Sequence, residues 1–316
     1  MMLDTGSSVT ILYTDTIPVS PDKILSQTVY KDFNGDKAGK LQKVVVDSLN
    51  TQAFQYQNKI LYELPAAQPP CSTMQFDGLL ARPIAPTGFY TELNYEHGFV
   101  RFVKNPDLTG YQSTRAYFSA YQGRFEILLN VNGTDGNFIF DTGNDAGIYL
   151  DREQYTMDNP LEQISYFTLM AGNKAVALQS DVHLASLKLG DYAFDQYVAV
   201  KSNKTHNNIG LKFISQFNWI LDQTNSKVYF KPIRPENFKA GVQHTPRPNF
   251  AYANVYDNKL VVAQMNYTDP DISVGDEIIS INGENVTLDN QCEMASRFNS
   301  MPFNKSQIVL KRNVVD

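Results

Sequence analysis

The triplet Asp-Thr-Gly occurs twice in the sequence, at Asp4-Thr5-Gly6 and at Asp141-Thr142-Gly143. The apolar residues Phe138, Ile139 and Phe140 lead into the second triplet. Aromatic and β-branched residues favour a pleated, buried surface, so this run predicts a strand. Glycine allows the chain to turn sharply after the carboxylate. We therefore expect each aspartate to lie where a buried strand ends.

Two carboxylates that face each other can perform acid–base chemistry on a bound water molecule. If the two triplets pack symmetrically, Asp4 and Asp141 meet at a pseudo-two-fold axis. Close carboxylates cannot both ionise, so the pair shares one proton and titrates as a unit. One carboxylate can take a proton from water while the other protonates a carbonyl group or its amine.

The remaining residues of the triplets have supporting roles in this arrangement. The hydroxyl groups of Thr5 and Thr142 can hydrogen-bond across the two-fold axis and lock the two loops together. Gly6 and Gly143 allow backbone amides to approach the carboxylates, because glycine has no side chain.

An internal repeat extends beyond the triplets, which are 141 − 4 = 137 positions apart. Asp47-Ser48-Leu49 is matched by Ala185-Ser186-Leu187, and Phe76-Asp77-Gly78-Leu79-Leu80 by Asn208-Ile209-Gly210-Leu211. Because the landmarks keep their order at a nearly constant offset, the sequence indicates a duplicated lobe.

Most segments within each copy have the pattern of short strands joined by polar turns. Strands are expected at 44–46, 59–62, 124–131 and 197–200, and hairpin tips at 34–36 and 171–173. One or two turns of helix are expected around 151–155 and 211–216. The chain is therefore predicted to be mainly β.

The composition of the sequence changes after Phe230, where prolines and polar residues indicate a linker at 233–250. Strands are predicted at 260–263 and 274–283, the second closed by an Asn-Gly turn. Leu288, Cys292, Ala295 and Phe298 have helical spacing. Residues 251–313 thus form a small third domain of mixed β and α content.

On these motifs, the chain resembles the bilobal aspartic peptidases of the pepsin/retropepsin type, with a C-terminal PDZ domain of the bacterial protease-associated kind. The peptidase resemblance rests on the two Asp-Thr-Gly triplets and on their apolar–Gly partner segments around Gly78 and Gly210. The PDZ resemblance rests on residues 274–283. It implies a mainly β fold with two pseudo-symmetric lobes, at 1–108 and 115–232, and a PDZ domain at 251–313. Asp4 and Asp141 are the catalytic residues that it implies, with no metal and no cofactor.

The sequence departs from the family pattern at three places. Ser7 follows the first triplet as usual, and its hydroxyl can bond the outer carboxylate oxygen, whereas Asn144 takes this position in the second copy. Tyr30 and Phe33 are the candidates for the aromatic residue of the flap hairpin. The lead-in hairpin before Asp141 has no counterpart before Asp4, so we expect the first lobe to be incomplete at its N-terminus.

Composition restricts the partners of the chain. Its net charge is −6, without a basic stripe, which argues against nucleic-acid binding. No apolar run reaches membrane-spanning length, and no signal peptide is visible. Cys71 and Cys292 are expected to be unpaired core residues in different domains. The four histidines have no metal-ligand spacing.

The function that the sequence predicts is an aspartic endopeptidase that binds an extended polypeptide, while the PDZ domain binds or presents peptide. The alternative is a peptidase-like peptide-binding module without turnover. A third reading, the phosphate loop of actin-like sugar kinases at Asp4-x-Gly6-x-Ser8, is disfavoured because no Gly-Gly adenosine loop follows. By analogy with PDZ-coupled proteases, we expect a periplasmic or cell-surface location.

Overall fold

Alternating and continuous apolar runs dictate a structure built almost entirely from strands. The computed structural model describes residues 2–6, 10–13, 23–31, 37–50, 55–64, 71, 78–81, 85, 88–118, 125–144, 147–170, 174–202, 206–234, 250–256, 258–301 and 306–312. Within these residues, α-helix is confined to α1 (Leu211–Ile214) and α2 (Gln291–Ser300). The mainly β prediction is confirmed. The helical turn expected at 151–155 is wrong, because a strand ends at Asp151 and a turn follows it.

The N-terminal part of the chain forms a six-stranded sheet with the order β1-β6-β2-β5-β4-β3. Its strands are β1 (Met2–Asp4), β2 (Ile11–Tyr13), β3 (Ile24–Lys31), β4 (Lys37–Asn50), β5 (Gln55–Leu64) and β6 (Gly78–Ala81). Strand β6 lies between β1, to which it is parallel, and β2, to which it is antiparallel. Strands β2 and β5 are parallel, whereas β5, β4 and β3 form antiparallel pairs.

The described strands from β7 onward are joined by a continuous series of pairings that closes into a barrel. Up to residue 232 they are β7 (Tyr90–Asn94), β8 (Phe99–Val103), β9 (Gln112–Phe118), β10 (Phe125–Val131), β11 (Thr134–Phe140), β12 (Ile148–Asp151), β13 (Glu162–Met170), β14 (Lys174–Leu189), β15 (Tyr192–Ser202), β16 (Asn208–Ile209), β17 (Phe217–Asp222) and β18 (Lys227–Pro232).

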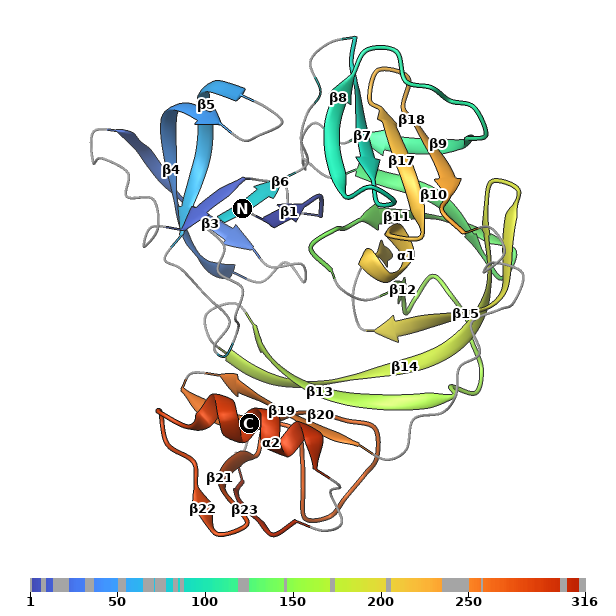
Figure 1. Cartoon of the computed structure of the whole chain (residues 1–316). Helices are drawn as coiled ribbons and strands as arrows, with labels where there is room; N and C mark the ends of the chain where they lie inside the picture. The colour runs from blue at the N-terminus through green and yellow to red at the C-terminus, as the bar shows by residue number, and fades with distance from the viewer. Residues whose placement is uncertain are drawn as a thin grey trace.

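The pairings around the second triplet have the same directions as those around the first. Strand β16 is parallel to β11 and antiparallel to β12, and β12 is parallel to β15. Strands β15, β14 and β13 then form antiparallel pairs, as β5, β4 and β3 do. Figure 1 shows β1 and β6 on one side of the molecule and β11 with α1 beside them.

The strand register corrects one detail of the sequence comparison. Leu3, which precedes Asp4, pairs with Leu80, and Phe140, which precedes Asp141, pairs with Ile209. The position of Gly210 therefore corresponds to Ala81, and Gly78 lies earlier on its strand. Setting Gly78 against Gly210 was wrong because a shared glycine is a weak guide to register between short apolar strands.

An aromatic core supports the strand that carries the second triplet. Phe140 is fully buried, with its ring 4.5 Å from that of Phe125 and 5.0 Å from that of Trp219 between centroids. The Trp219 indole N–H donates to the carbonyl of Ile214 at the end of α1 (2.8 Å). Edge-on and offset aromatic contacts of this kind add to the stabilisation from burial.

The C-terminal segment, residues 250–312, has a hydrophobic cluster of its own. It contains α2 together with β19 (Ala251–Tyr256), β20 (Lys259–Met265), β21 (Glu277–Ile281), β22 (Glu284–Asn285) and β23 (Ile308–Lys311). Asn282 and Gly283 both have positive φ, at 52° and 80°, which is the type I′ hairpin turn that the Asn-Gly pair predicts. No helix among the described residues is long and apolar enough to span a membrane.

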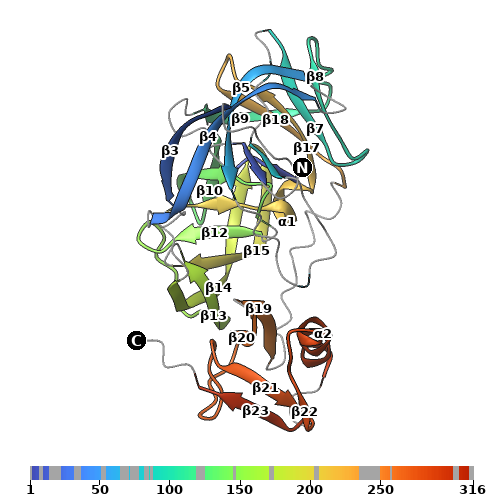
Figure 2. The same ribbon diagram turned by 90° about the vertical axis from the view of Figure 1, so that its left-hand side faces the viewer.

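The C-terminal segment is joined to the preceding strands by an edge pairing between β20 and β13. Ser165 pairs with Met265, and Tyr166 pairs with Gln264. Asn266 donates to the Glu162 carboxylate at 2.6 Å. Figures 1 and 2 both show β19 and β20 directly against the long curved hairpin of β13 and β14. The two parts of the chain therefore share main-chain hydrogen bonds.

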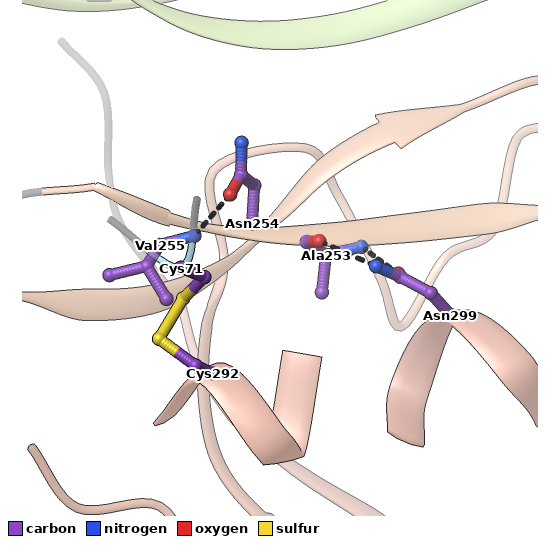
Figure 3. The surroundings of a disulfide bond; sticks show 6 residues. All are labelled: Cys71, Ala253, Asn254, Val255, Cys292 and Asn299. Carbon is purple, nitrogen blue, oxygen red and sulfur yellow. Dashed lines mark hydrogen bonds between the residues drawn. A yellow bond between two sulfur atoms is a disulfide. The ribbon is translucent and has the colours of Figure 1, made fainter. Parts of the chain in front are cut away.

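A disulfide makes a second connection to the C-terminal segment. Cys71 is bonded to Cys292, with Cα atoms 5.1 Å apart. Figure 3 shows the bridge at the start of α2, near Asn254 and Val255 of β19. The expectation of two unpaired core cysteines is wrong. A separation of 221 residues gives no hint of proximity, which only the fold creates.

Replacing Phe140 with alanine should destabilise the protein severely, because the cavity would open between Phe125 and Trp219. We expect Phe140→Ala to lower the free energy of unfolding by about 3–5 kcal/mol. Urea unfolding followed by circular dichroism measures this. The control is Tyr117→Ala, which removes a largely exposed ring and should cost about 0.5 kcal/mol or less. Equal losses in the two variants would contradict the assignment of this core.

Candidate active site

Thr5 and Thr142 join the two triplets through reciprocal hydrogen bonds. The Thr5 N–H donates to Thr142 Oγ1 (3.1 Å), and the Thr142 N–H donates to Thr5 Oγ1 (3.0 Å). Each hydroxyl in turn donates to the carbonyl before the opposite aspartate: Thr5 to Phe140 (2.6 Å) and Thr142 to Leu3 (2.8 Å). Both residues are buried. The structure thus brings these sequence-predicted residues together.

The number of hydroxyl protons determines which hydrogen bonds the two threonine side chains can donate. A hydroxyl has one proton, and here both protons point to backbone carbonyls. The two oxygens, 3.3 Å apart, are therefore neighbours in a shared network and do not need a bond to each other. All four polar groups are satisfied away from water, so separating the loops would leave buried donors and acceptors unpaired.

Asp141 lies immediately after β11, and its backbone continues the pairing of that strand. Its N–H donates to the carbonyl of Ile209 (3.0 Å). The carboxylate is half-buried and accepts from the Gly143 N–H at Oδ1 (3.0 Å) and from Asn208 Nδ2 at Oδ2 (2.8 Å). Both oxygens are therefore held by neutral donors, which fixes the plane of the carboxyl group.

Asn144 supports this carboxylate indirectly, through Asn208. Its side-chain amide donates to Asn208 Oδ1 (2.9 Å), and Asn208 donates to Asp141. Its backbone carbonyl accepts from the Leu211 N–H at the start of α1 (2.7 Å). The sequence placed Asn144 in a supporting role but missed Asn208, whose contribution depends on where β16 lies beside the loop.

Gly6 of the first triplet packs directly against the Asp141 carboxyl group. A Cβ atom built at Gly6 would overlap the Asp141 Cγ and come within 2.7 Å of Oδ2. Any side chain here would push the two loops apart, so the first loop and the second carboxylate approach each other only because this residue is glycine.

Asp4 ends β1, where it pairs with Ala81 of β6. The side chain of Asp4 lies outside the part of the chain that the structure describes, as do Ser7 and Phe33. Tyr30 lies on β3, where its backbone pairs with Gly39, and its side chain is likewise outside the described part. The hairpin tip expected at 34–36 falls in the same undescribed region, between β3 and β4.

The buried histidine His183 lies on β14, outside the two triplets. Burial lowers its pKa, although the carboxylate of Asp181 acts in the opposite direction. Among the described residues, no group of three or more histidine, cysteine or acidic side chains is arranged to hold a metal ion.

No protein-family model matches the chain, and a search of curated proteins finds no match. The functional assignment therefore rests on the geometry of the two triplets.

Thr5→Val and Thr142→Val test the reciprocal contact without reference to activity. Each variant should lower the free energy of unfolding by about 1–3 kcal/mol, because valine leaves buried polar groups unpaired. The double variant should differ from the sum of the singles by about 0.5–3 kcal/mol, since both remove the same network. Chemical denaturation of the four proteins measures this coupling.

The control pairs Thr5→Val with Thr114→Val. The Thr114 hydroxyl donates to the Leu128 carbonyl, whereas Thr5 bonds Phe140 and Thr142. We expect these two changes to be additive. Additive effects of Thr5→Val and Thr142→Val would contradict the reciprocal network.

Proposed function

We propose that the chain is a bilobal aspartic endopeptidase, in which Asp4 and Asp141 activate a water molecule for attack on a peptide bond. One observation carries this proposal: the reciprocal hydrogen bonds between Thr5 and Thr142, with Gly6 against the Asp141 carboxyl group. A structural turn at either Asp-Thr-Gly triplet would not require the two triplets to contact each other.

The matching strand pairings around the two triplets support two lobes related by a pseudo-two-fold axis. The five pairings among β1 to β6 have counterparts of the same direction among β11 to β16. In this arrangement, the hairpin of β3 and β4 covers the substrate, with Tyr30 or Phe33 as the aromatic residue of the flap. An extended polypeptide lies between the lobes.

The proposed chemistry needs only the two carboxyl groups and water. One ionised carboxylate takes a proton from the water, whose oxygen forms a bond to the scissile carbonyl carbon. The other carboxyl group protonates the carbonyl oxygen, which gives a tetrahedral intermediate. Proton transfer to the amide nitrogen then lets the C–N bond break. Fixed donors on Asp141, from Gly143 and Asn208, prepare one carboxylate for this role before substrate binds.

We further propose that the C-terminal segment is a PDZ domain. Its separate hydrophobic cluster, and the packing of α2 along β19, support this proposal. Peptide recognition in such domains adds a strand to a sheet edge. The Cys71–Cys292 disulfide supports a periplasmic or cell-surface location, because disulfides persist in oxidising compartments.

Asp141→Asn tests the proposed activity. The variant keeps the size of the side chain but removes the carboxylate, so cleavage of an unfolded protein substrate should fall to background. The matched control is Asp135→Asn, at the other end of β11, where the exposed carboxylate accepts a hydrogen bond from Asn130. This control should cleave at the wild-type rate.

A statine-type inhibitor separates the two functions predicted from the sequence. Because its hydroxyl group mimics the tetrahedral intermediate, it should inhibit cleavage and raise the melting temperature of the wild-type protein. If the inhibitor binds but the wild type does not cleave substrate, the chain is a peptide-binding module. Cleavage that persists in Asp141→Asn would refute the dyad.

A further inference from the structure

We propose that Asn208 is the positioning residue for the Asp141 carboxylate, and that it replaces the hydroxyl donor expected after the second triplet. This inference rests on the proposed peptidase function. In the first copy, Ser7 has the residue type that can bond the outer carboxylate oxygen. In the second copy Asn144 has this position, and its side chain donates to Asn208.

The backbone of Asn208 is fixed on both sides. It pairs with Ile139 of β11 on one edge and with Tyr149 of β12 on the other. Strand β11 carries Asp141 at its end, so the same sheet positions both the carboxylate and its donor. The side chain of Asn208 therefore needs no rearrangement to reach Asp141 Oδ2 at 2.8 Å.

Asn144 determines which way the Asn208 amide points. It donates to Asn208 Oδ1, so the oxygen of that amide faces Asn144 and its nitrogen faces Asp141. A flipped amide would set two NH₂ groups against each other and place a carbonyl oxygen against the carboxylate. The chain Asn144–Asn208–Asp141 therefore has one favourable orientation.

The first copy lacks this arrangement on its corresponding strand. Ile139 and Met2 both lie two residues before their aspartates, and their pairing partners are Asn208 and Leu79. Leucine has no side-chain donor, so the described strand β6 has no amide side chain at the position that corresponds to Asn208.

Steady-state kinetics of Asn208→Ala test this role. We expect kcat to fall about 10–100-fold, as for other residues that orient a reactive group, while KM changes less than about twofold. Asn144→Ala should lower kcat less, and it should have no further effect in the Asn208→Ala background. Independent, multiplicative effects of the two variants would overturn the relay.

Asn207→Ala is the matched control. The adjacent asparagine is buried, but its amide donates to the Asn137 carbonyl and to the Gln154 side chain. This variant should lower stability and leave kcat near the wild-type value. An equal fall of kcat in the Asn207→Ala and Asn208→Ala variants would mean that Asn208 has only a structural role.

A stability cycle between Asn208→Ala and Asp141→Asn separates this inference from the proposed function. If the contact exists, the change of the folding equilibrium constant in the double variant should differ about tenfold from the product of the two single changes. If the wild type shows no cleavage, the proposed function fails, yet this cycle still measures the contact. Additive effects overturn the Asn208 proposal in either case.

A separate observation carries a second proposal: the Cys71–Cys292 disulfide is a thiol-sensitive link between the C-terminal segment and the strand beside Asp4. Both cysteines are exposed, so a small thiol can reach the bond. Exposed disulfides are the ones that thiol exchange opens most readily. Figure 3 places the bridge at the start of α2.

The disulfide and the β13–β20 pairing connect the C-terminal segment to two different parts of the chain. Cys71 precedes β6, the strand on which Ala81 pairs with Asp4. Cys292 belongs to α2, and the same segment is hydrogen-bonded to β13 through β20. The C-terminal segment is therefore held by a disulfide at Cys292 and by a strand pairing at β20.

The Cys71–Cys292 bond is reduced by thiol–disulfide exchange with a dithiol reductant. One thiolate of the dithiol attacks a bridge sulfur, the Cys71–Cys292 bond breaks, and the second thiol closes the reductant into its own disulfide. Two electrons and two protons are thereby transferred to the cysteine sulfurs. After reduction, Cys71, which precedes β6 in the sequence, is no longer cross-linked to α2, whereas the β13–β20 pairing remains.

Amide hydrogen exchange on the full chain, with and without a dithiol, tests whether the disulfide stabilises β1 and β6. Reduction should raise exchange in Met2–Asp4 and Gly78–Ala81 about tenfold and leave the amides of β13 and β20 unchanged. The Cys71→Ser/Cys292→Ser double variant should show the reduced pattern under both conditions. Unchanged exchange in β1 and β6, or an equal rise in β13 and β20, would overturn this proposal.

Discussion

The whole arrangement depends on two buried threonine hydroxyl groups that cannot be satisfied by their own loops. Each donates to a carbonyl of the opposite loop and accepts an N–H from it. Since burial without a partner is costly for every one of these groups, only one relative position of the loops satisfies them all. That position also brings Gly6 against the Asp141 carboxyl group. The contact between the triplets and the placement of the carboxylate are thus one constraint.

Rigidity around Asp141 comes from two different kinds of interaction. Behind it, Phe140 is fixed by its aromatic neighbours, so the end of β11 has little freedom to move. In front, a backbone N–H and a side-chain amide hold the two oxygens. Neither donor has a formal charge, and so the carboxylate gains orientation without an ion pair. An ion pair would compete with protons for the same oxygens.

Features with a local cause were predicted from the sequence. The Asn282-Gly283 turn follows from the conformational freedom of these residues, and α2 from the helical spacing of Cys292, Ala295 and Phe298. The hydrogen bonding of Thr5 and Thr142 followed from the duplication. Local chemistry dictates the turn and the helix, whereas the threonine contact is long-range and was predicted because the internal repeat relates the two triplets.

Features that depend on long-range packing could not be predicted. The role of Asn208 requires knowledge of which side chain β16 presents to Asp141, and a polar residue in a short strand has many other uses. The register that matches Gly210 with Ala81 is set by strand pairing, which a shared glycine does not determine. The Cys71–Cys292 bond joins residues that only the fold brings together. Linear spacing has no information about such contacts.

The pairing of β13 with β20 also limits how the molecule can be divided. Ile164 and Phe167 of β13 are almost fully buried, and Met265 of β20 is buried as well. A fragment that ends before β20 would expose a strand edge flanked by apolar side chains, and such edges recruit other strands. Protection from aggregation is therefore shared between the two parts. Shuffling either part into a new protein would require a substitute strand at this edge.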